Sequence, residues 1–299
     1  MLMAQKTISL ILGSGGARGL AHIGVIRAIE EAGYKIDAIS GCSIGAVIGG
    51  IYAANKLDAY EQWARQIRRV DVLKLMDLSW DKSGLLKGDR VISTLTELVG
   101  DQAIEDLPIR FTAMATDLES KTEVWLNKGS LFRAIRASIS IPWLLTPVKY
   151  KDTHLVDGGI LNPVPMAPSF NDDTDYKIAV NLGGPDKFKK SAKKDNSESD
   201  EDSFRGRIDK FIDNMTTSFK KGDESTLASY DLGNMAFEAM QSTIARYKLA
   251  AYPPDYLIEI PANAASLMDF HKADELISLG YDYGKRCIAD IQKSENYPS

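Results

Sequence analysis

One stretch, residues 36 to 45, constrains the fold of this chain more than any other. A short apolar run ends in a Gly-x-Ser-x-Gly turn formed by Gly41, Ser43 and Gly45, and an uncharged, helix-like segment continues to about Asn55. Glycines two residues before and two after the serine leave room where a strand turns sharply into a helix. The pattern predicts a nucleophile elbow with Ser43 exposed at its tip, and a buried helix whose positive dipole end is directed at Ser43.

A glycine-rich loop precedes this elbow. Residues 7–12 form a continuous β-prone run, and residues 20–31 have the pattern of a helix that stops at Gly33. Between them lies the sequence Gly13-Ser14-Gly15-Gly16-Ala17-Arg18-Gly19. Together with the elbow this forms a βαβα unit, which implies parallel strands in a sheet that is covered on both faces.

Acyl transfer requires a nucleophile, a base and donors that stabilise an oxyanion, and the chain has a candidate for each. Ser43 is the candidate nucleophile. The glycine loop should lie beside it, because the carboxyl ends of neighbouring parallel strands meet at one edge, and its consecutive N–H groups form an anion cradle. Asp157, followed by Gly158 and Gly159, is the candidate base, although Asp-Gly-Gly alone is typical of an ordinary turn.

The rest of the chain predicts alternating helices and strands. Strands are expected at 109–116, 122–126, 148–150, 154–156, 176–182 and 256–260. Helical patterns occur at 58–76, 88–99, 130–140, 204–219, 224–250 and 271–294. We therefore predict an α/β fold with three layers, in which a mostly parallel sheet is flanked by helices and followed by a helical C-terminal portion.

Composition changes abruptly after Gly184. Residues 186–202 contain five lysines and six acids and almost nothing apolar. Such a segment is typical of a disordered surface loop, which we favour over a functional basic patch. We expect a single domain over residues 1–299, with a catalytic core at about 7–182 and a helical C-terminal part at 203–299.

Charge and cysteine content narrow the class of protein. The net charge of −5 argues against a nucleic-acid partner. Cys42 and Cys287 lack metal-ligand spacing, so we expect free thiols in a reducing compartment. The N-terminus lacks the features of a signal peptide, and no stretch reaches the length of a membrane span. These features predict a cytoplasmic protein with at most weak, peripheral membrane contact.

The glycine loop, the elbow and the Asp-Gly-Gly turn, in this order and spacing, resemble the patatin-like phospholipase family. The resemblance includes residues 136–142, covers residues 7–182 well and covers the remainder loosely. It implies that Ser43 and Asp157 form a catalytic dyad and that no histidine takes part. It also implies hydrolysis of phospholipids, lysophospholipids or other acyl esters, with no metal or cofactor.

The same resemblance implies an oxyanion hole in the glycine loop, formed by Gly15, Gly16, Ala17 and Arg18. One position departs from the family pattern, because Ser14 stands where three consecutive glycines usually begin. Arg18 either holds the loop by ion pairing or binds a lipid phosphate, and we favour the structural role.

Three other functions remain open. An ordinary α/β-hydrolase would use a Ser-Asp-His triad of Ser43, Asp157 and His271, but the elbow follows only the second strand and His271 opens a helix. A dinucleotide-binding module would explain the glycine loop, but the second strand ends in Ser40 and Gly41 rather than in an acid. The third is a catalytically silent lipid-binding or scaffold protein.

Apolar residues after the elbow could form the wall of an acyl groove beside the serine. They are Trp63, Ile67, Leu73, Leu75, Met76, Leu85 and Leu86. Plain core packing would explain them equally well.

Overall fold

The structure is a computed structural model that describes residues 5–75, 86–186 and 225–296. The helix predicted at 204–219 lies outside these residues, and so does the charged segment from residue 187 onward. Met76 and Leu85 of the proposed groove also lie outside them.

The chain forms two compact units, one made of residues 1–187 and 241–299 and the other of residues 188–240. The first unit contains the sheet and every catalytic motif predicted from the sequence. The helix α8 (Ser225–Ala251) has its C-terminal part in this unit. A single domain over the whole chain stays a prediction.

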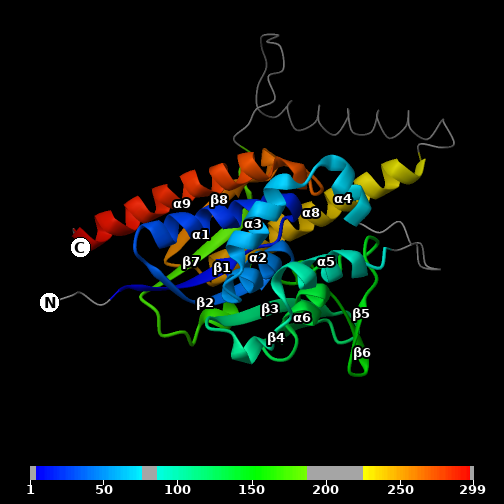
Figure 1. Cartoon of the computed structure of the whole chain (residues 1–299), viewed down its shortest axis with the longest axis horizontal. Helices are drawn as coiled ribbons and strands as arrows, with labels where there is room; N and C mark the ends of the chain where they lie inside the picture. The colour runs from blue at the N-terminus through cyan, green and yellow to red at the C-terminus, as the bar shows by residue number, and fades with distance from the viewer. Residues whose placement is uncertain (1–4, 76–85, 187–224, 297–299) are drawn as a thin grey trace, which may run out of the picture. The chain divides into compact units, whose positions relative to one another are not determined.

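An eight-stranded mixed sheet forms the core of the first unit (Figure 1). Its strands are β1 (Thr7–Leu12), β2 (Lys35–Cys42), β3 (Arg110–Asp117), β4 (Thr122–Leu126), β5 (Val148–Tyr150), β6 (Thr153–Asp157), β7 (Tyr176–Gly184) and β8 (Tyr256–Pro261). The order is β5-β6-β3-β2-β1-β7-β8, and β4 pairs with β3. The run from β3 to β8 is parallel and the remaining pairings are antiparallel, which confirms the predicted mostly parallel sheet.

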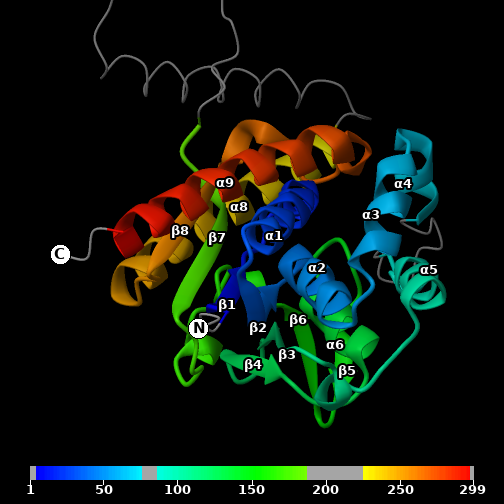
Figure 2. The same cartoon turned by 60° about the vertical axis from the view of Figure 1, so that its left-hand side comes forward.

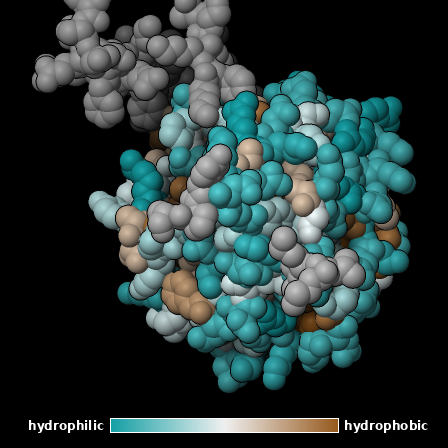
Figure 3. All heavy atoms as spheres, turned by 90° about the vertical axis from the view of Figure 1, so that its left-hand side faces the viewer, coloured by the Kyte–Doolittle hydropathy of each residue, from teal (hydrophilic) through white to brown (hydrophobic). Residues whose placement is uncertain are grey.

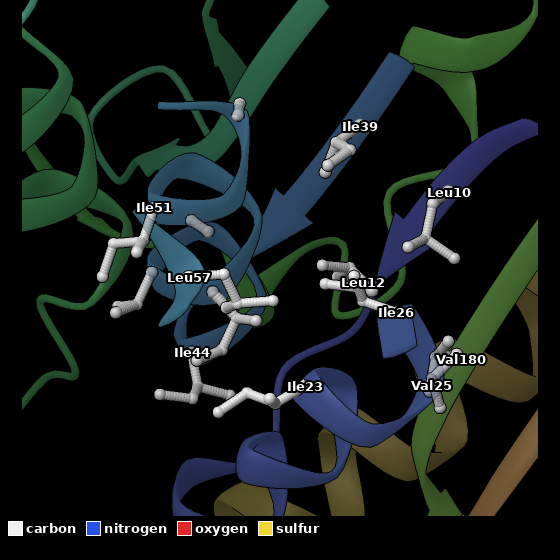
Figure 4. Close-up of a cluster of buried hydrophobic side chains, with 14 of the residues drawn as sticks. Leu10, Leu12, Ile23, Val25, Ile26, Ile39, Ile44, Ile51, Leu57 and Val180 are labelled. Carbon is white, nitrogen blue, oxygen red and sulfur yellow. The ribbon is translucent and has the colours of Figure 1, made fainter. Parts of the chain in front are cut away.

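Alternation along β1 separates two apolar layers. Leu10 and Leu12 belong to a large cluster with residues of the helices on one face (Figure 4). Ile11 belongs to a smaller cluster on the other face, with Ala245 and Leu249 of α8. Because successive side chains of a strand point to opposite faces, both faces of β1 are covered, as the three-layer prediction requires.

The described helices agree with the sequence pattern except in two places. They are α1 (Ala21–Glu31), α2 (Ile44–Ala53), α3 (Leu57–Gln66), α4 (Arg69–Leu75), α5 (Asp89–Val99), α6 (Leu131–Ser138), α8 and α9 (Ala273–Asn296). The single segment predicted at 58–76 is two helices, because the backbone is extended at Ile67. The glycine loop enters α1 through a short 3-10 turn, η1 (Gly16–Leu20).

Strand β3 brings two distant strands together. Its residues Ala113 and Met114 pair with both β2 and β4, whereas its last residues pair with both β4 and β6. A strand has only two sides, so β2 and β6 lie end to end on the side opposite β4. Cys42 is the partner of Met114, and Asp157 is the partner of the next residue of β3. The ends of β2 and β6 therefore meet.

Among the described residues, no helix is both long enough and apolar enough to cross a membrane. On the face drawn in Figure 3, hydrophilic residues predominate and hydrophobic residues are scattered among them.

Helices α1 and α9 lie alongside each other (Figures 1 and 2). A Cβ atom on Gly280 of α9 would lie 1.9 Å from the carbonyl oxygen of Ala21, and one on Gly24 of α1 would lie 1.9 Å from that of Ile277. Two glycines therefore allow the backbones of these helices to touch.

Replacing Gly280 by alanine should lower the free energy of unfolding by about 2 kcal/mol, because the methyl group overpacks the helix contact. Helix propensity alone would raise stability by up to about 1 kcal/mol. Urea denaturation measures the difference, with Ser278→Ala, an exposed position on the same helix, as the control. A Gly280→Ala protein as stable as the wild type would contradict the close contact.

Candidate active site

The strand-to-helix turn expected at the Gly-x-Ser-x-Gly sequence is present. Ser43 lies between β2 and α2 with φ 55° and ψ −121°, in a region that non-glycine residues rarely adopt. A Cβ atom on Gly41 would lie 2.4 Å from the carbonyl oxygen of Gly45, and one on Gly45 would lie 2.1 Å from that of Leu12. Only glycines allow strand and helix to close up at this point.

Ser43 differs from the prediction in its exposure, since only 4% of it is accessible. It lines an apolar cavity of about 170 Å³. The elbow therefore opens into this apolar cavity. The walls come from η1, α2, α3, α4, α5, residues 139–145 and residues 267–270.

A second serine holds the elbow in its strained conformation. The backbone N–H of Ser43 donates to Oγ of Ser138 at 2.9 Å, and Oγ of Ser138 donates to the carbonyl oxygen of Met114 at 2.6 Å. No sequence signal distinguishes Ser138 as a functional residue, although it lies within the 136–142 motif. These two bonds connect the elbow to α6 and β3.

Asp157 is fully buried at the end of β6. Its Oδ1 accepts the backbone N–H of Gly159 at 2.7 Å and lies 4.0 Å from Sγ of Cys42. Its Oδ2 has no hydrogen-bond partner among the described residues. Burial raises the pKa of Asp157 to about 7, and the Ser43 hydroxyl and the Gly159 N–H offset part of this rise. The carboxyl group is therefore close to Ser43 and has one oxygen free.

The glycine loop presents two unoccupied donors. The N–H groups of Gly13 and Ser14 donate to the carbonyl oxygens of Val180 and Pro163. Those of Gly15 and Gly16 meet no acceptor within the described parts of the chain, and Gly16 lines the same cavity as Ser43. This supply of free N–H groups is what an anion site requires.

Ala17 and Arg18 both bond to the segment that follows β8. The N–H of Ala17 donates to the carbonyl oxygen of Leu267 at 2.9 Å, so it is occupied. The buried guanidinium of Arg18 donates to the carbonyl oxygens of Ala262 at 2.6 Å and Ala265 at 3.5 Å. Both residues thus attach the glycine loop to the segment after β8, which agrees with the structural role favoured for Arg18.

Only some of the residues predicted to form the acyl groove line the cavity. Trp63, Ile67 and Leu75 line the cavity with Ser43. Leu86 is not among the lining residues, and the side chain of Leu73 lies outside the described part of the structure.

None of the three histidines is among the groups that shift the pKa of Asp157. His22 is buried with Nε2 2.9 Å from the carbonyl oxygen of Gly13. His154 is exposed beside Glu119. His271 lies in the turn η6 (Phe270–Lys272) and contributes to the lowered pKa of Asp269. Among the described residues, no cluster of histidine, cysteine or acidic side chains could hold a metal ion.

Comparison with known proteins identifies relatives of this chain. Residues 10–169 match the family described as patatin-like phospholipase. An uncharacterized NTE family protein of Mycobacterium tuberculosis is 34% identical over 93% of this chain and 90% of its own length. Human patatin-like phospholipase domain-containing protein 6 is 30% identical over 95% of this chain, which corresponds to 20% of the human protein. Lysophospholipase NTE1 of Debaryomyces hansenii is 33% identical over 62% of this chain and 12% of its own length. The family match covers more than half of the chain and includes the elbow, the glycine loop and the Asp-Gly-Gly turn, so the chain belongs to the patatin-like phospholipase family.

Proposed function

We propose that this protein is a serine hydrolase that cleaves acyl ester bonds of phospholipids or lysophospholipids through Ser43 and Asp157. Membership of the patatin-like phospholipase family and similarity to NTE proteins support a lipid esterase. The observation that carries the proposal is the meeting of β2 and β6 on one side of β3, with Ser43 and Asp157 at their ends.

The reaction starts when Oδ2 of Asp157 accepts the proton of the Ser43 hydroxyl as Oγ attacks the ester carbonyl. Ser43 lies close enough to Asp157 to lower the pKa of its carboxyl group, although Oδ2 has no hydrogen-bond partner among the described residues. Catalytic hydrogen bonds are often long in the free enzyme and shorten when substrate binds. The N–H groups of Gly15 and Gly16 then stabilise the oxyanion.

Collapse of the tetrahedral intermediate releases the alcohol, which takes the proton from Asp157. A water molecule next attacks the acyl group on Ser43 while Asp157 accepts one of its protons, and Asp157 returns this proton to Oγ of Ser43 as the fatty acid leaves. A pKa of about 7 suits this cycle, since a base works best when its pKa lies near the operating pH. The same carboxyl can thus both accept and return the proton.

The cavity supports an acyl chain as the part of the substrate that is buried. Its lining consists almost entirely of apolar residues, which come mainly from α2, α3, α4, α5, residues 139–145 and residues 267–270. The name of the Debaryomyces relative, a lysophospholipase, agrees with a substrate of this kind.

The most direct test of the proposed nucleophile is labelling with a fluorophosphonate probe followed by mass spectrometry, which should locate the adduct on Ser43.

Removing either proposed catalytic group should abolish activity. Ser43→Ala deletes the nucleophile and Asp157→Asn deletes the base, so each should lower kcat/KM for a long-chain ester by about 10³-fold or more. His271→Ala should retain most of the activity, because a dyad has no third member to lose. Steady-state assays on the purified variants measure these effects.

Thermal unfolding of the same variants shows whether they fold. Asp157→Asn should be at least as stable as the wild type above pH 7, where the native protein holds a buried carboxylate whose protonated form it favours. If His271→Ala were as inactive as Ser43→Ala, the protein would use a triad and the dyad would be wrong.

Activity should also depend on the ionisation of Asp157. The carboxylate is the active form, so kcat/KM should fall as the pH drops through about 7 and level off above it. Replacing His154 and His271 together by alanine should leave the midpoint of this step unchanged. A pH profile of kcat/KM measures it, and a midpoint that moves with these histidines would contradict the assignment to Asp157.

An acyl site in the cavity predicts a dependence on chain length. Each buried methylene contributes about 0.8 kcal/mol, so kcat/KM should rise about fourfold per methylene until the cavity is full. Ala64→Leu, at a buried position of the lining, makes the cavity smaller. It should lower kcat/KM for the long-chain esters and leave kcat/KM for the acetate ester unchanged. The measurement uses p-nitrophenyl esters from acetate to palmitate below their aggregation thresholds. A flat series would contradict the acyl site and leave the dyad untouched.

A further inference from the structure

Helix α8 places one buried polar side chain, Gln241, between the glycine loop and the loop that follows Asp157. Gln241 is 9% exposed. Its Nε2 donates to Oγ of Ser14 at 3.1 Å, and its Oε1 lies 3.4 Å from the same hydroxyl. Ser14 directly precedes Gly15 and Gly16 and is the residue at which the chain departs from the glycine pattern of the family. The amide of Gln241 is thus bonded to the loop that carries the free N–H groups.

The same amide lies against the loop that follows Asp157. A Cβ atom on Gly159 would lie 2.0 Å from Nε2 of Gln241 and 3.0 Å from Oδ1 of Asp157. Both atoms are close to one point, so the amide and the carboxylate are near neighbours. The amide therefore occupies the space that a side chain at position 159 would take. The N–H of Gly159 is the donor that holds Oδ1 and leaves Oδ2 free.

The segment of α8 that carries Gln241 is firmly attached. Ala245 and Leu249, one and two turns further on, are buried in the second apolar cluster. Nζ of Lys248 contacts Oε1 of Glu123 on β4 at 2.6 Å. These contacts fix the position of the helix along and around its own axis. The position of the Gln241 amide is therefore determined by the packing of α8 and not by the loops that the amide touches.

We propose that Gln241 is a positioning residue that sets the glycine loop and the Asp157 loop at a fixed distance from each other. This inference rests on the proposed function. Through Ser14 the amide fixes the peptide that carries the oxyanion donors, and through Gly159 it fixes the carboxylate that takes the serine proton. Small misplacements of reacting groups lower rates strongly, so one side chain that spans both loops affects the transition state more than substrate binding.

The test is a double-mutant cycle with Gln241→Met and Ser14→Gly. Methionine has a similar length without hydrogen-bonding groups, and glycine at 14 removes the hydroxyl and matches the family pattern. Loss of one such bond corresponds to about tenfold. Each variant should therefore lower kcat for a long-chain ester about tenfold and change KM less than about twofold. The double variant should be no worse than either single one, because both remove the same contact.

A pH profile reports on the proximity of position 241 to the base. Gln241→Glu places a second carboxyl near Asp157, which should raise the pKa of Asp157 and move the acid limb of kcat/KM upward by about one unit. The other ionisable groups nearby are the thiol of Cys42, close to Oδ1, and the Glu123–Lys248 pair. None of these changes in this variant. A merely structural glutamine elsewhere on the helix would not produce this shift.

Tyr247→Met, at a largely exposed position of α8, is the matched control and should retain wild-type kcat, KM and melting temperature. Additive losses in the cycle, or Gln241→Met with wild-type kcat, would overturn the positioning role. If Ser43→Ala and fluorophosphonate labelling behave as expected in that case, the proposed function stands and only this inference fails. If Gln241→Met does not fold, Ser14→Gly and the pH profile of Gln241→Glu still decide the question.

Discussion

The site depends on the unequal pairing of strand β3. Because β4 covers one side of β3 along its last residues, the other side is divided between β2 and β6. Strand β6 runs against β3, so its last residue, Asp157, meets the end of β2. The proposed nucleophile and base come from positions more than a hundred residues apart in the chain, and the backbone ladder of one strand sets their separation.

Several unfavourable features are concentrated at this junction. Ser43 has a positive φ angle, Asp157 is a buried carboxyl group, and the two loop N–H groups have no acceptor within the described chain. Such features persist only where the surroundings determine the conformation. Here the surroundings are short hydrogen bonds to Ser138 and Gly159 and large apolar layers on both faces of the sheet. The strain is therefore local, and the stability that tolerates it comes from the packed helices and strands.

Local steric rules made the elbow, the glycine loop and most helices and strands predictable from the sequence. The glycine spacing around Ser43 has one structural explanation, and the structure has that turn. Features that depend on distant partners were not predictable in this way. The buried position of Ser43 and the use of the Ala17 N–H by Leu267 both arise from segments that meet only in the fold.

Ser138 and Gln241 are two residues of the site whose roles could not be predicted from the sequence, for the same reason. Serine and glutamine are common on helices, and neither spacing nor composition distinguishes these two from exposed residues of the same types. Their roles follow from what lies opposite them: Ser138 faces the backbone of the elbow, and Gln241 faces a glycine that leaves room for it. A sequence motif reports residues whose own conformation is restricted. The residues that hold such a motif in place are restricted only by their neighbours, so a catalytic site can be recognised from sequence well before its supporting contacts can.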